Sequence, residues 1–333
     1  MYRITYFGVV LLLILVTATA NAQLFNLKLL PVEQNNQYGY IDHAGKLIIQ
    51  PQFDSGKPFV EGFAAVKLGD KWGYIDRTGK LVINPQFQSA DSFSAGFAAV
   101  KLGGKWGYID KTGKLAINPQ FEAADSFNEG FACVKLAGKR GYIDKTGKYT
   151  INPQFDDAES FSDSLAVVKV GGLIKGKRGY IDQTGKLVIN PQFDDAKSFS
   201  SGYAAVKLGG VIKGKWGYID RTGTYIINPQ FENADSFSEG FARAETSNKW
   251  GYIDKTGKYI INPQYNTAES FSEGLAKVEI SGRVGYIDKT GKYVINPQFD
   301  DAESFSDGVA KVKLGDKYGY IDRTGKYIWN PSK

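Results

Sequence analysis

The chain has 333 residues, of which 42% are hydrophobic and 14% aromatic, too much apolar material for an intrinsically disordered protein. Its formal net charge of +6 is spread along the chain without a basic run, which argues against nucleic acid as a partner. Cys133 is the only cysteine, so an intramolecular disulfide is excluded.

The chain begins with the pattern of a secretory signal peptide. Arg3 is followed by an apolar run from Phe7 to Val16 and by the small-x-small site Ala20-Asn21-Ala22, which predicts cleavage after Ala22. The apolar run is short for a membrane span, which needs roughly 20 residues, and an uncleaved anchor is the alternative. We therefore expect a periplasmic or secreted protein with no membrane span after cleavage. The predicted organisation is a signal peptide at 1–22, an N-terminal lead strand and cap at 23–36, and a repeat array at 37–333.

The array repeats a short glycine-rich and aromatic unit. A glycine that precedes Tyr-Ile-Asp recurs at spacings of 34, 34, 34, 38, 38, 34, 34 and 34 residues. A period of 34 is also typical of helical tetratricopeptide arrays, but each unit contains several glycines and many β-branched or aromatic residues, which excludes helices. The nine glycines are Gly39, Gly73, Gly107, Gly141, Gly179, Gly217, Gly251, Gly285 and Gly319.

Each unit is predicted to contain three short strands. In the copy around Gly107, strands at 106–109 and 115–117 flank the loop Asp110-Lys111-Thr112-Gly113, which has the composition of a tight hairpin turn. We expect Asn118-Pro119 to end the second of these strands, because proline has no N–H to donate.

The third strand of each unit lies just before the hairpin of the next unit. It carries small residues at the same positions in successive copies, and we call these positions the small-residue column. Ala98 and Val100 lie two positions apart and therefore point to one face, where small side chains indicate close packing on a neighbour. Counting back from Gly39 by the same offsets places Leu30 and Val32 in this column. The segment after the signal peptide is thus expected to supply the first such strand.

These patterns predict an all-β fold, a tandem array of nine three-stranded units of about 34 residues with a solenoid-like or curved superhelical course. A closed β-propeller-like ring is the alternative. The objection to it is that ordinary propeller blades have four strands and about 40 to 50 residues.

The segments KWGYIDKTGK, INPQF and FSEGLA together resemble the bacterial WG (KWG) repeat, and the resemblance covers most of the chain. It implies a binding role and no common reaction. Four copies carry the tryptophan of the motif, whereas the other five carry Tyr38, Arg140, Arg178, Val284 and Tyr318.

The tryptophan position is the first candidate binding site. Since an unpaired buried guanidinium is costly and arginine occurs here twice, we expect an edge position with one side in water. Its side chains then either form a ledge over the next repeat or form a discontinuous row of stacking platforms for sugar rings or a partner's side chains. The candidate ligand-binding residues are Trp72, Trp106, Trp216, Trp250, Arg140 and Arg178.

The two 38-residue spacings predict a second candidate site. Both four-residue insertions fall between the third strand and the next hairpin, and they should form two longer loops. These are either tolerated extensions or a basic docking patch made by Lys175, Lys177, Lys213 and Lys215.

No catalytic constellation is evident in the sequence. His43 is the only histidine and occupies a hairpin tip, so there is no zinc ligand set, and a Ser-His-Asp or Cys-His arrangement would have to use His43. No phosphate-binding glycine loop is present. Carboxylates cluster at 156–159, 194–195 and 300–303, and a glycosidase needs only two of them. Because these carboxylates recur with the repeat, we interpret them as turn and solvating residues.

The sequence favours a non-catalytic extracytoplasmic binding or scaffold protein that uses a repeated β surface to engage a protein or a glycan at the cell envelope. The alternatives are a carbohydrate-active enzyme that uses the repeated carboxylates and a purely structural envelope protein. No metal, cofactor or nucleic acid is expected. The identity of the ligand and the oligomeric state stay open.

Overall fold

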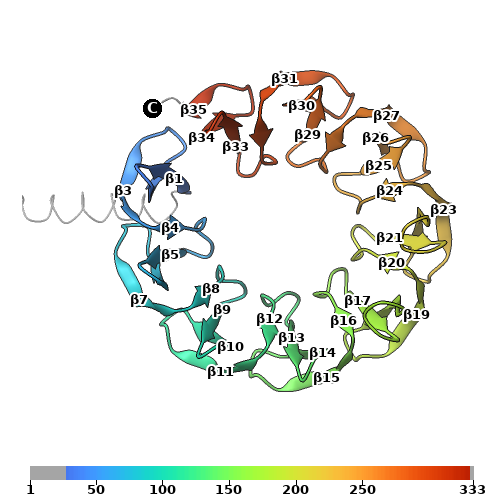
Figure 1. Cartoon of the computed structure of the whole chain (residues 1–333), viewed down its shortest axis with the longest axis horizontal. Coiled ribbons are helices and arrows are strands. Elements are labelled where there is room, and N and C mark those ends of the chain that lie inside the picture. The colour runs from blue at the N-terminus through green and yellow to red at the C-terminus, as the bar shows by residue number, and fades with distance from the viewer. Residues whose placement is uncertain (1–27, 331–333) are drawn as a thin grey trace, which may run out of the picture. The chain divides into compact units, whose positions relative to one another are not determined.

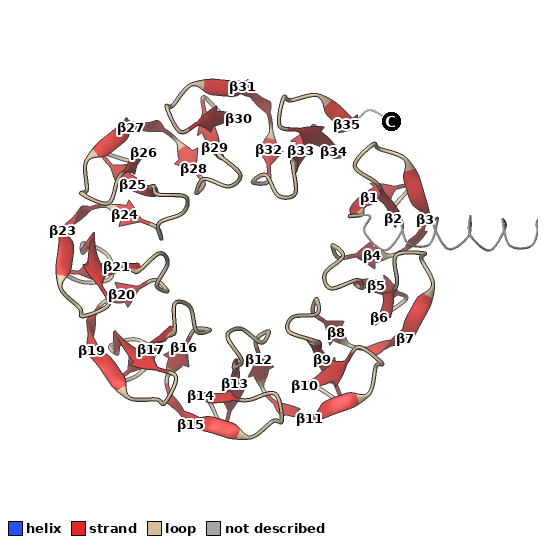
Figure 2. Cartoon of the chain, turned by 180° about the vertical axis from the view of Figure 1, so that it is seen from behind, coloured by secondary structure: helices blue, strands red, loops and turns tan. Residues whose placement is uncertain are grey.

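The computed structural model describes residues 28–330, so the predicted signal peptide lies outside the described residues. The described residues divide into two compact units: the first runs to Gly104 and includes Tyr108–Leu115, and the second, larger unit comprises Lys105–Gly107 and the described residues from Ala116 onward. All regular elements in the described part are strands, arranged in nine small sheets (Figure 2). We call each sheet a blade and number the blades in chain order.

The first blade has three strands in the order β1-β2-β3. These strands are β1 (Leu30–Gln34), β2 (Gln37–Ile41) and β3 (Leu47–Phe53). Val32 lies opposite Gly39, just as Val66 lies opposite Gly73 in the second blade. The prediction that Leu30 and Val32 belong to the small-residue column is therefore confirmed.

Each of the other eight blades has four strands that lie side by side in chain order (Figure 1). Blades 2 to 5 consist of β4 (Ser55–Gly56), β5 (Ala64–Leu68), β6 (Lys71–Ile75), β7 (Leu81–Phe87); β8 (Ser89–Ala90), β9 (Phe97–Leu102), β10 (Lys105–Asp110), β11 (Leu115–Phe121); β12 (Ala123–Ala124), β13 (Ala132–Leu136), β14 (Lys139–Ile143), β15 (Tyr149–Phe155); and β16 (Asp157–Ala158), β17 (Leu165–Val170), β18 (Lys177–Asp182), β19 (Leu187–Phe193).

Blades 6 to 9 repeat this plan. They consist of β20 (Asp195–Ala196), β21 (Tyr203–Leu208), β22 (Lys215–Asp220), β23 (Tyr225–Phe231); β24 (Asn233–Ala234), β25 (Ala242–Thr246), β26 (Lys249–Ile253), β27 (Tyr259–Tyr265); β28 (Thr267–Ala268), β29 (Leu275–Ile280), β30 (Arg283–Asp288), β31 (Tyr293–Phe299); and β32 (Asp301–Ala302), β33 (Val309–Leu314), β34 (Lys317–Asp322), β35 (Tyr327–Trp329).

The prediction of three strands per unit is wrong for these eight blades. The missed strand has two residues, as in β12, where Ala123 pairs with Lys135 and Ala124 pairs with Val134. Two residues are too few to produce a recognisable alternation of apolar and polar side chains. Such a short first strand also explains how a four-stranded blade fits into 34 residues.

Within the larger unit, successive blades follow a curved course (Figure 1). The long fourth strands β15, β19, β23, β27 and β31 lie on its convex side, and the two-residue first strands lie on its concave side (Figures 1 and 2). The fourth strand is the edge strand of its blade, and its outward side chains are exposed.

The Asn-Pro pair does not end the strand as predicted. β15 continues through Asn152 and Pro153 to Phe155, and the pairing with β14 shifts there, from Tyr142 opposite Ile151 to Arg140 opposite Phe155. Proline is tolerated because β15 is an edge strand and the shift is a bulge, where no ladder hydrogen bond from its nitrogen is required.

The glycine after the tryptophan position is required by this bulge. A Cβ atom at Gly141 would lie 2.6 Å from the carbonyl oxygen of Ile151 and 2.6 Å from the nitrogen of Pro153. Both are backbone atoms of the bulged strand and cannot move aside independently. Only glycine allows the third and fourth strands to approach this closely.

The hairpin loops have the predicted turn chemistry. In blade 4, Asp144 Oδ1 accepts hydrogen bonds from the backbone N–H of Thr146 at 2.9 Å, from the Thr146 hydroxyl at 2.6 Å and from the N–H of Lys148 at 3.1 Å. Gly147 has a φ of 84° and packs on Ile117 of the preceding blade. The loop is therefore closed by its own residues and docked on its neighbour.

The hydrophobic core lies between consecutive blades. The cluster between blades 4 and 5 contains Tyr142, Ile151 and Phe155 from one blade and Phe161 and Val168 from the next. Each blade is too thin to bury apolar surface alone, so stacking on a neighbour supplies the core. No helix among residues 28–330 is long and apolar enough to cross a membrane.

Candidate functional site

The tryptophan position of the repeat lies at the junction between blades. Trp72 on β6 packs against the core cluster that combines side chains of blades 2 and 3, and it is half-buried, as are Trp106 and Trp250. Trp216 is only 4% exposed and belongs to the cluster between blades 6 and 7, and Val284 is also buried. The expected edge position with one wet side thus holds for three tryptophans and is wrong for Trp216 and Val284.

Cationic side chains lie over the indole rings. Lys57 Nζ is 5.6 Å from the ring centroid of Trp72, and the guanidinium carbon of Arg243 is 4.9 Å from that of Trp250. Lys197 and Lys207 lie 5.8 Å and 6.0 Å from the centroid of Trp216. These contacts are cation–π interactions, so protein groups already occupy part of the aromatic surface predicted to stack on ligands.

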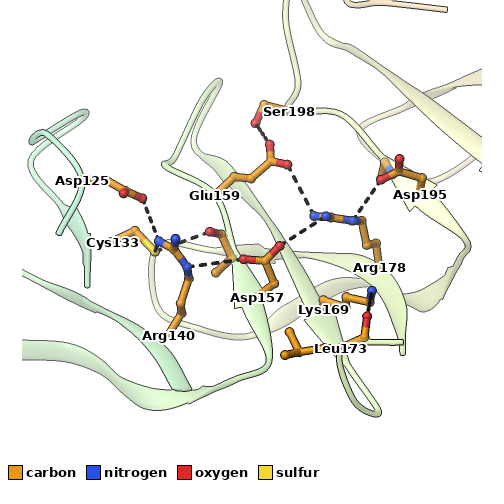
Figure 3. Close-up of polar contacts among 12 residues, drawn as sticks. Asp125, Cys133, Arg140, Asp157, Glu159, Lys169, Leu173, Arg178, Asp195 and Ser198 are labelled. Carbon is orange, nitrogen blue, oxygen red and sulfur yellow. Dashed lines mark hydrogen bonds and ion pairs between the residues drawn. The ribbon is translucent and has the colours of Figure 1, made fainter. Parts of the chain in front are cut away.

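The two arginines at the tryptophan position connect blades through ion pairs (Figure 3). In blade 4, Arg140 Nη1 lies 3.0 Å from Asp125 Oδ2 of the same blade, and Arg140 Nε lies 3.3 Å from Asp157 Oδ1 of blade 5. Both carboxylates are partly exposed, which limits the energetic value of each pair. Arg140 nevertheless has a neighbour in each of two blades.

Arg178 repeats this arrangement one blade further on. Its Nη2 lies 3.3 Å from Asp157 Oδ2, its Nη1 lies 3.4 Å from Glu159 Oε1, and its Nε lies 3.0 Å from Asp195 Oδ1 of blade 6 (Figure 3). Asp157 therefore bridges two arginines. A continuous ladder of alternating charge runs from blade 4 to blade 6.

A second ladder joins blades 6 to 9 by the same principle, although its arginine comes from a different strand. Arg243 on β25 lies 2.6 Å from Asp235 of its own blade and 3.5 Å from Glu269 of blade 8. Lys197 of blade 6 reaches Asp235 at 3.5 Å. Lys277 of blade 8 contacts Glu269 at 3.8 Å and Asp301 of blade 9 at 4.0 Å. The blade junctions of the larger unit are thus cross-linked by charge as well as by apolar packing.

Burial and these partners shift several pKa values. Burial raises the pKa of Asp125, and the charge and hydrogen bond of Arg140 only partly oppose the shift. For Asp235 burial acts in the same direction, but the hydrogen bond from Arg243 and the charges of Lys197 and Arg243 outweigh it and leave the pKa lowered. Burial raises the pKa of the Cys133 thiol to about 12.

The carboxylates of the acidic segments at 156–159, 194–195 and 300–303 have two structural roles. The first carboxylate of a segment accepts a hydrogen bond from the turn between the second and third strands: Asp156 Oδ2 from Gly172 N–H at 2.6 Å, and Asp194 Oδ2 from Gly210 N–H at 2.7 Å. The next carboxylate, such as Asp157, belongs to the ion-pair ladder. The turn role predicted for these segments is found at the first position, and the ladder role was not predicted.

The predicted basic patch is divided by the structure. Lys177 pairs with Asp194 at 2.5 Å and Lys215 lies 3.7 Å from Glu232, whereas Lys175 and Lys213 are exposed and have no carboxylate partner among residues 28–330. His43 lies in its hairpin loop as predicted, but it is half-buried and its Nε2 has no hydrogen-bond partner in the described part of the chain. No group of three or more His, Cys, Asp or Glu in that part is placed to hold a metal ion.

Sequence reasoning missed the exposed amides of the fourth strands. In every INPQF segment the asparagine and glutamine point away from the buried isoleucine and phenylalanine. These side chains are exposed, and apart from a 3.3 Å bond from Gln52 to the carbonyl oxygen of Gln50 they make no hydrogen bond within residues 28–330. The residues are Asn84, Asn118, Asn152, Asn190, Asn228, Asn262 and Asn296, and Gln52, Gln86, Gln120, Gln154, Gln192, Gln230, Gln264 and Gln298.

A signal for this surface was present in the sequence. The outward position two residues before the asparagine changes freely between copies, as Val82, Ala116, Thr150 and Val188 show. The asparagine and glutamine on the same outward face do not change in blades 2 to 8, and blade 1 has Gln50 in place of the asparagine. An exposed position without an internal partner that stays constant among varying neighbours indicates contact with something outside the chain. We call the outward Asn and Gln side chains of β15, β19, β23, β27 and β31 the amide face.

Among solved structures, the chain resembles the crystal structure of a eukaryotic initiation factor, with 10% identity over 91% of this chain and 95% of that chain and a TM-score of 0.67. It also resembles Hsv2p of Kluyveromyces lactis, with 10% identity, 68% and 89% coverage and a TM-score of 0.44. An extracellular domain from B. thetaiotaomicron (BT4673) matches with 10% identity, 91% and 57% coverage and a TM-score of 0.40. At these identities the first likeness shows a shared fold alone. No curated protein matches the sequence significantly.

The family comparison agrees with the repeat analysis. The model described as "WG containing repeat" matches eight tandem segments, at residues 38–72, 72–106, 106–139, 141–173, 179–211, 216–250, 250–283 and 285–318. These segments span most of the described residues and most of the nine blades. The chain therefore belongs to the WG containing repeat family.

Proposed function

We propose that this protein is a non-catalytic binding protein of the cell envelope that holds an extended glycan on its amide face. The observation that carries the proposal is the constant, exposed and unpartnered set of Asn and Gln side chains on successive edge strands. Each primary amide offers two donors and an acceptor. This combination suits the hydroxyl groups of sugars, which also both donate and accept.

The repetition of the surface favours a repetitive ligand. A single exposed amide contributes little, because its hydrogen bonds to a ligand replace hydrogen bonds to water. Several equivalent sites along one polymer act together, since after the first contact the others form within the same complex.

The tryptophan row stays a prediction for ligand binding. Its packing at the blade junctions and the cations over its rings support the ledge interpretation. If Trp250 is only a ledge, Trp250→Ala will lower the melting temperature and leave the affinity for ligand unchanged. Loss of ligand with an unchanged melting temperature would support the stacking interpretation.

The non-catalytic part of the proposal rests on how the reactive groups are used. The Cys133 thiol is buried and has a raised pKa, which disfavours the thiolate needed for nucleophilic chemistry. The carboxylates Asp156, Asp194 and Asp300 accept hydrogen bonds from turn backbones, and Asp157 and Asp195 pair with arginines. Turnover of a polysaccharide that disappears in Asp157→Asn would overturn this part.

We also propose that the blades close into a β-propeller rather than extend as a solenoid. Four-stranded blades in chain order remove the main objection to a propeller, and the curved course of the larger unit supports this arrangement. Small-angle scattering tests it, because a closed disc has a much smaller radius of gyration than an open array of the same length. The predicted signal peptide supports export to the periplasm or beyond, which N-terminal sequencing of the secreted protein tests.

The amide face is tested with residues 23–333 on a glycan array and on envelope extracts. The variant carries Asn190→Ala, Gln192→Ala, Asn228→Ala and Gln230→Ala on β19 and β23, and a control carries Thr150→Ala and Val188→Ala at varying outward positions. Because all these side chains reach the surface, both variants are expected to fold. We expect at least a tenfold weaker affinity for the retained glycan in the amide variant only. Equal affinity in the amide variant would place the site elsewhere, and retention of envelope proteins alone would make the ligand a protein.

A further inference from the structure

The two inserted loops, residues 171–176 and 209–214, carry the most exposed aliphatic side chains in the described part of the chain. Leu173 and Ile174 are 65% and 88% exposed, and Val211 and Ile212 are 64% and 92% exposed. We call these two segments the loop pair. They join the second and third strands in blades 5 and 6, so they emerge at the same end of neighbouring blades.

The other blades have no such loops at this position. Their two-residue turns consist of small or polar residues, namely Asn35-Asn36, Gly69-Asp70, Gly103-Gly104, Ala137-Gly138, Ser247-Asn248, Ser281-Gly282 and Gly315-Asp316. Aliphatic residues are therefore not needed to close this connection. Their presence at the tips of the loop pair requires another explanation, because adjacent exposed apolar residues on a soluble domain mark a contact surface.

Both loops have the same defined conformation. Gly176 N–H donates to the carbonyl oxygen of Gly172 at 2.9 Å, and Gly214 N–H donates to that of Gly210 at 2.9 Å, which closes one helical turn in each loop. Asp156 accepts from the N–H of Gly172. The aliphatic tips are thus held away from the body of the protein by an ordered turn.

Lysines complete the hydrogen bonding of the loops. The ammonium group of Lys169 donates to the carbonyl oxygen of Leu173, and that of Lys207 donates to the carbonyl oxygen of Val211. Part of the loop backbone is therefore satisfied internally. This matters for a segment that enters an apolar phase, where an unsatisfied backbone group is costly.

Positive charge surrounds the tips. Lys175 and Lys213 directly follow the exposed isoleucines and have no carboxylate partner among residues 28–330, and Lys169 and Lys207 are bonded to carbonyl oxygens rather than to carboxylates. Each loop therefore combines two protruding aliphatic side chains with nearby uncompensated ammonium groups. Anionic headgroups over an acyl layer have the complementary arrangement of charge and apolar surface.

We propose that the loop pair inserts its four aliphatic side chains into the surface of an anionic lipid membrane. The aliphatic side chains enter the boundary between headgroups and acyl chains, while Lys175 and Lys213 contact the headgroups. Two loops on adjacent blades bind the same surface together, so the second contact follows readily from the first. This site lies on the turns between the second and third strands and is independent of the amide face on the fourth strands.

Flotation with vesicles tests the proposal on residues 23–333. We expect binding to vesicles of phosphatidylcholine with 30% phosphatidylglycerol and little binding to pure phosphatidylcholine. Ile174→Ser with Ile212→Ser should weaken binding at least tenfold. The matched control, Ile260→Ser with Val294→Ser, removes aliphatic residues that are 45% and 42% exposed on fourth strands and should bind like the wild type. Absence of wild-type binding, or equal binding by the loop variant, would overturn the proposal.

A label placed in one loop tests the depth of insertion. In Ile174→Cys the new thiol is exposed, whereas Cys133 is buried and will not react with the reagent under native conditions. An environment-sensitive fluorophore at position 174 should shift to shorter wavelength on anionic vesicles. A vesicle-bound protein without this shift would show that another surface makes the contact and would refute the proposal.

Discussion

The hydroxyl of Tyr142 donates a hydrogen bond of 2.7 Å to the backbone carbonyl oxygen of Glu159, which lies 17 residues further along the chain in the next blade. Tyr142 is fully buried, so this bond forms away from water. This tyrosine, which is the same in all nine copies of the repeat, therefore fastens one repeat to the next. The same bond joins Tyr40 to Lys57, Tyr74 to Asp91, Tyr180 to Lys197, Tyr218 to Asp235, Tyr252 to Glu269, and Tyr286 to Glu303.

Removal of this hydroxyl should cost measurable stability. Tyr142→Phe leaves the carbonyl oxygen of Glu159 without its donor, and we expect the free energy of unfolding to fall by about 1 to 2 kcal/mol in chemical denaturation. Tyr149→Phe is the matched control, because the Tyr149 hydroxyl is buried and has no hydrogen-bond partner within the described residues. The control should be neutral or slightly stabilising. Equal losses in the two variants would contradict the assigned role of the bond.

The glycine of the Trp-Gly pair should not tolerate even a methyl group. Gly141→Ala places a Cβ against two backbone atoms of β15, and we expect a loss of about 3 kcal/mol or more, at the upper end of overpacking effects. Gly138→Ala is the comparison, because that glycine has a positive φ but open space around it and should lose only about 1 kcal/mol. Thermal unfolding of both variants distinguishes steric conflict from conformational preference. A smaller loss in Gly141→Ala than in Gly138→Ala would show that the strand shift is not rigid.

The arginine ladder should stabilise the contact between blades 5 and 6. Arg178→Ala leaves Glu159 and Asp195 without a cation, while Asp157 keeps Arg140, and we expect a loss of about 1 to 2 kcal/mol because these carboxylates are partly exposed. High salt should reduce the difference between the variant and the wild type, since salt screens the charges that the variant leaves unpaired. Lys175→Ala serves as the comparison for loss of an exposed cation that has no carboxylate partner among residues 28–330. A salt-independent difference would assign the effect of Arg178 to packing instead.

The hairpin aspartates should make the protein sensitive to acid. The hydrogen bond from the Thr146 hydroxyl, together with bonds from backbone N–H groups, lowers the pKa of Asp144 in the folded state. A carboxyl group whose pKa is lower in the folded state than in the unfolded state stabilises the protein at pH values above the unfolded-state pKa of about 3.9. This contribution disappears as the pH falls through the pKa of the folded state. Asp110, Asp182, Asp220, Asp254 and Asp288 have the same shift and the same leading cause.

We therefore expect the melting temperature to fall steeply below about pH 4, with little contribution from these groups to its change between pH 5 and pH 7. Thermal unfolding between pH 2.5 and pH 7 measures this profile. Asp144→Asn keeps an oxygen acceptor but cannot titrate, so it should start from a lower stability at pH 7 and approach the wild type at low pH. A constant difference between the two proteins across this range would show that Asp144 titrates as it does in the unfolded chain.

The number of repeats and the hairpins could be read from the sequence because each depends on residues close together in the chain. The turn at Asp144 is closed by atoms of Thr146 and Lys148, within four residues. These features repeat with the unit, so nine copies reinforced each reading.

Other features required the arrangement of neighbouring strands and blades. β12 is too short to leave a pattern and is recognised only by its pairing with β13. The role of Gly141 depends on how closely β15 passes, and the pairing of Arg178 depends on Asp195 in the next blade. Sequence composition could not show that the lysines of one patch divide into Lys177, paired with Asp194, and Lys175, which is free of carboxylates.

The sequence by itself determined an all-β repeat chain of the WG family, because strand alternation and turn chemistry are local properties. Only the tertiary structure decided which exposed residues have no bonding or packing partner within the described part of the protein. Whether Asn190 or Ile174 is used inside the protein depends on which atoms the fold brings within bonding or packing distance, and in both cases it brings none. The structure was therefore needed to show that the side chains of the amide face and of the loop pair have no partner within the described residues.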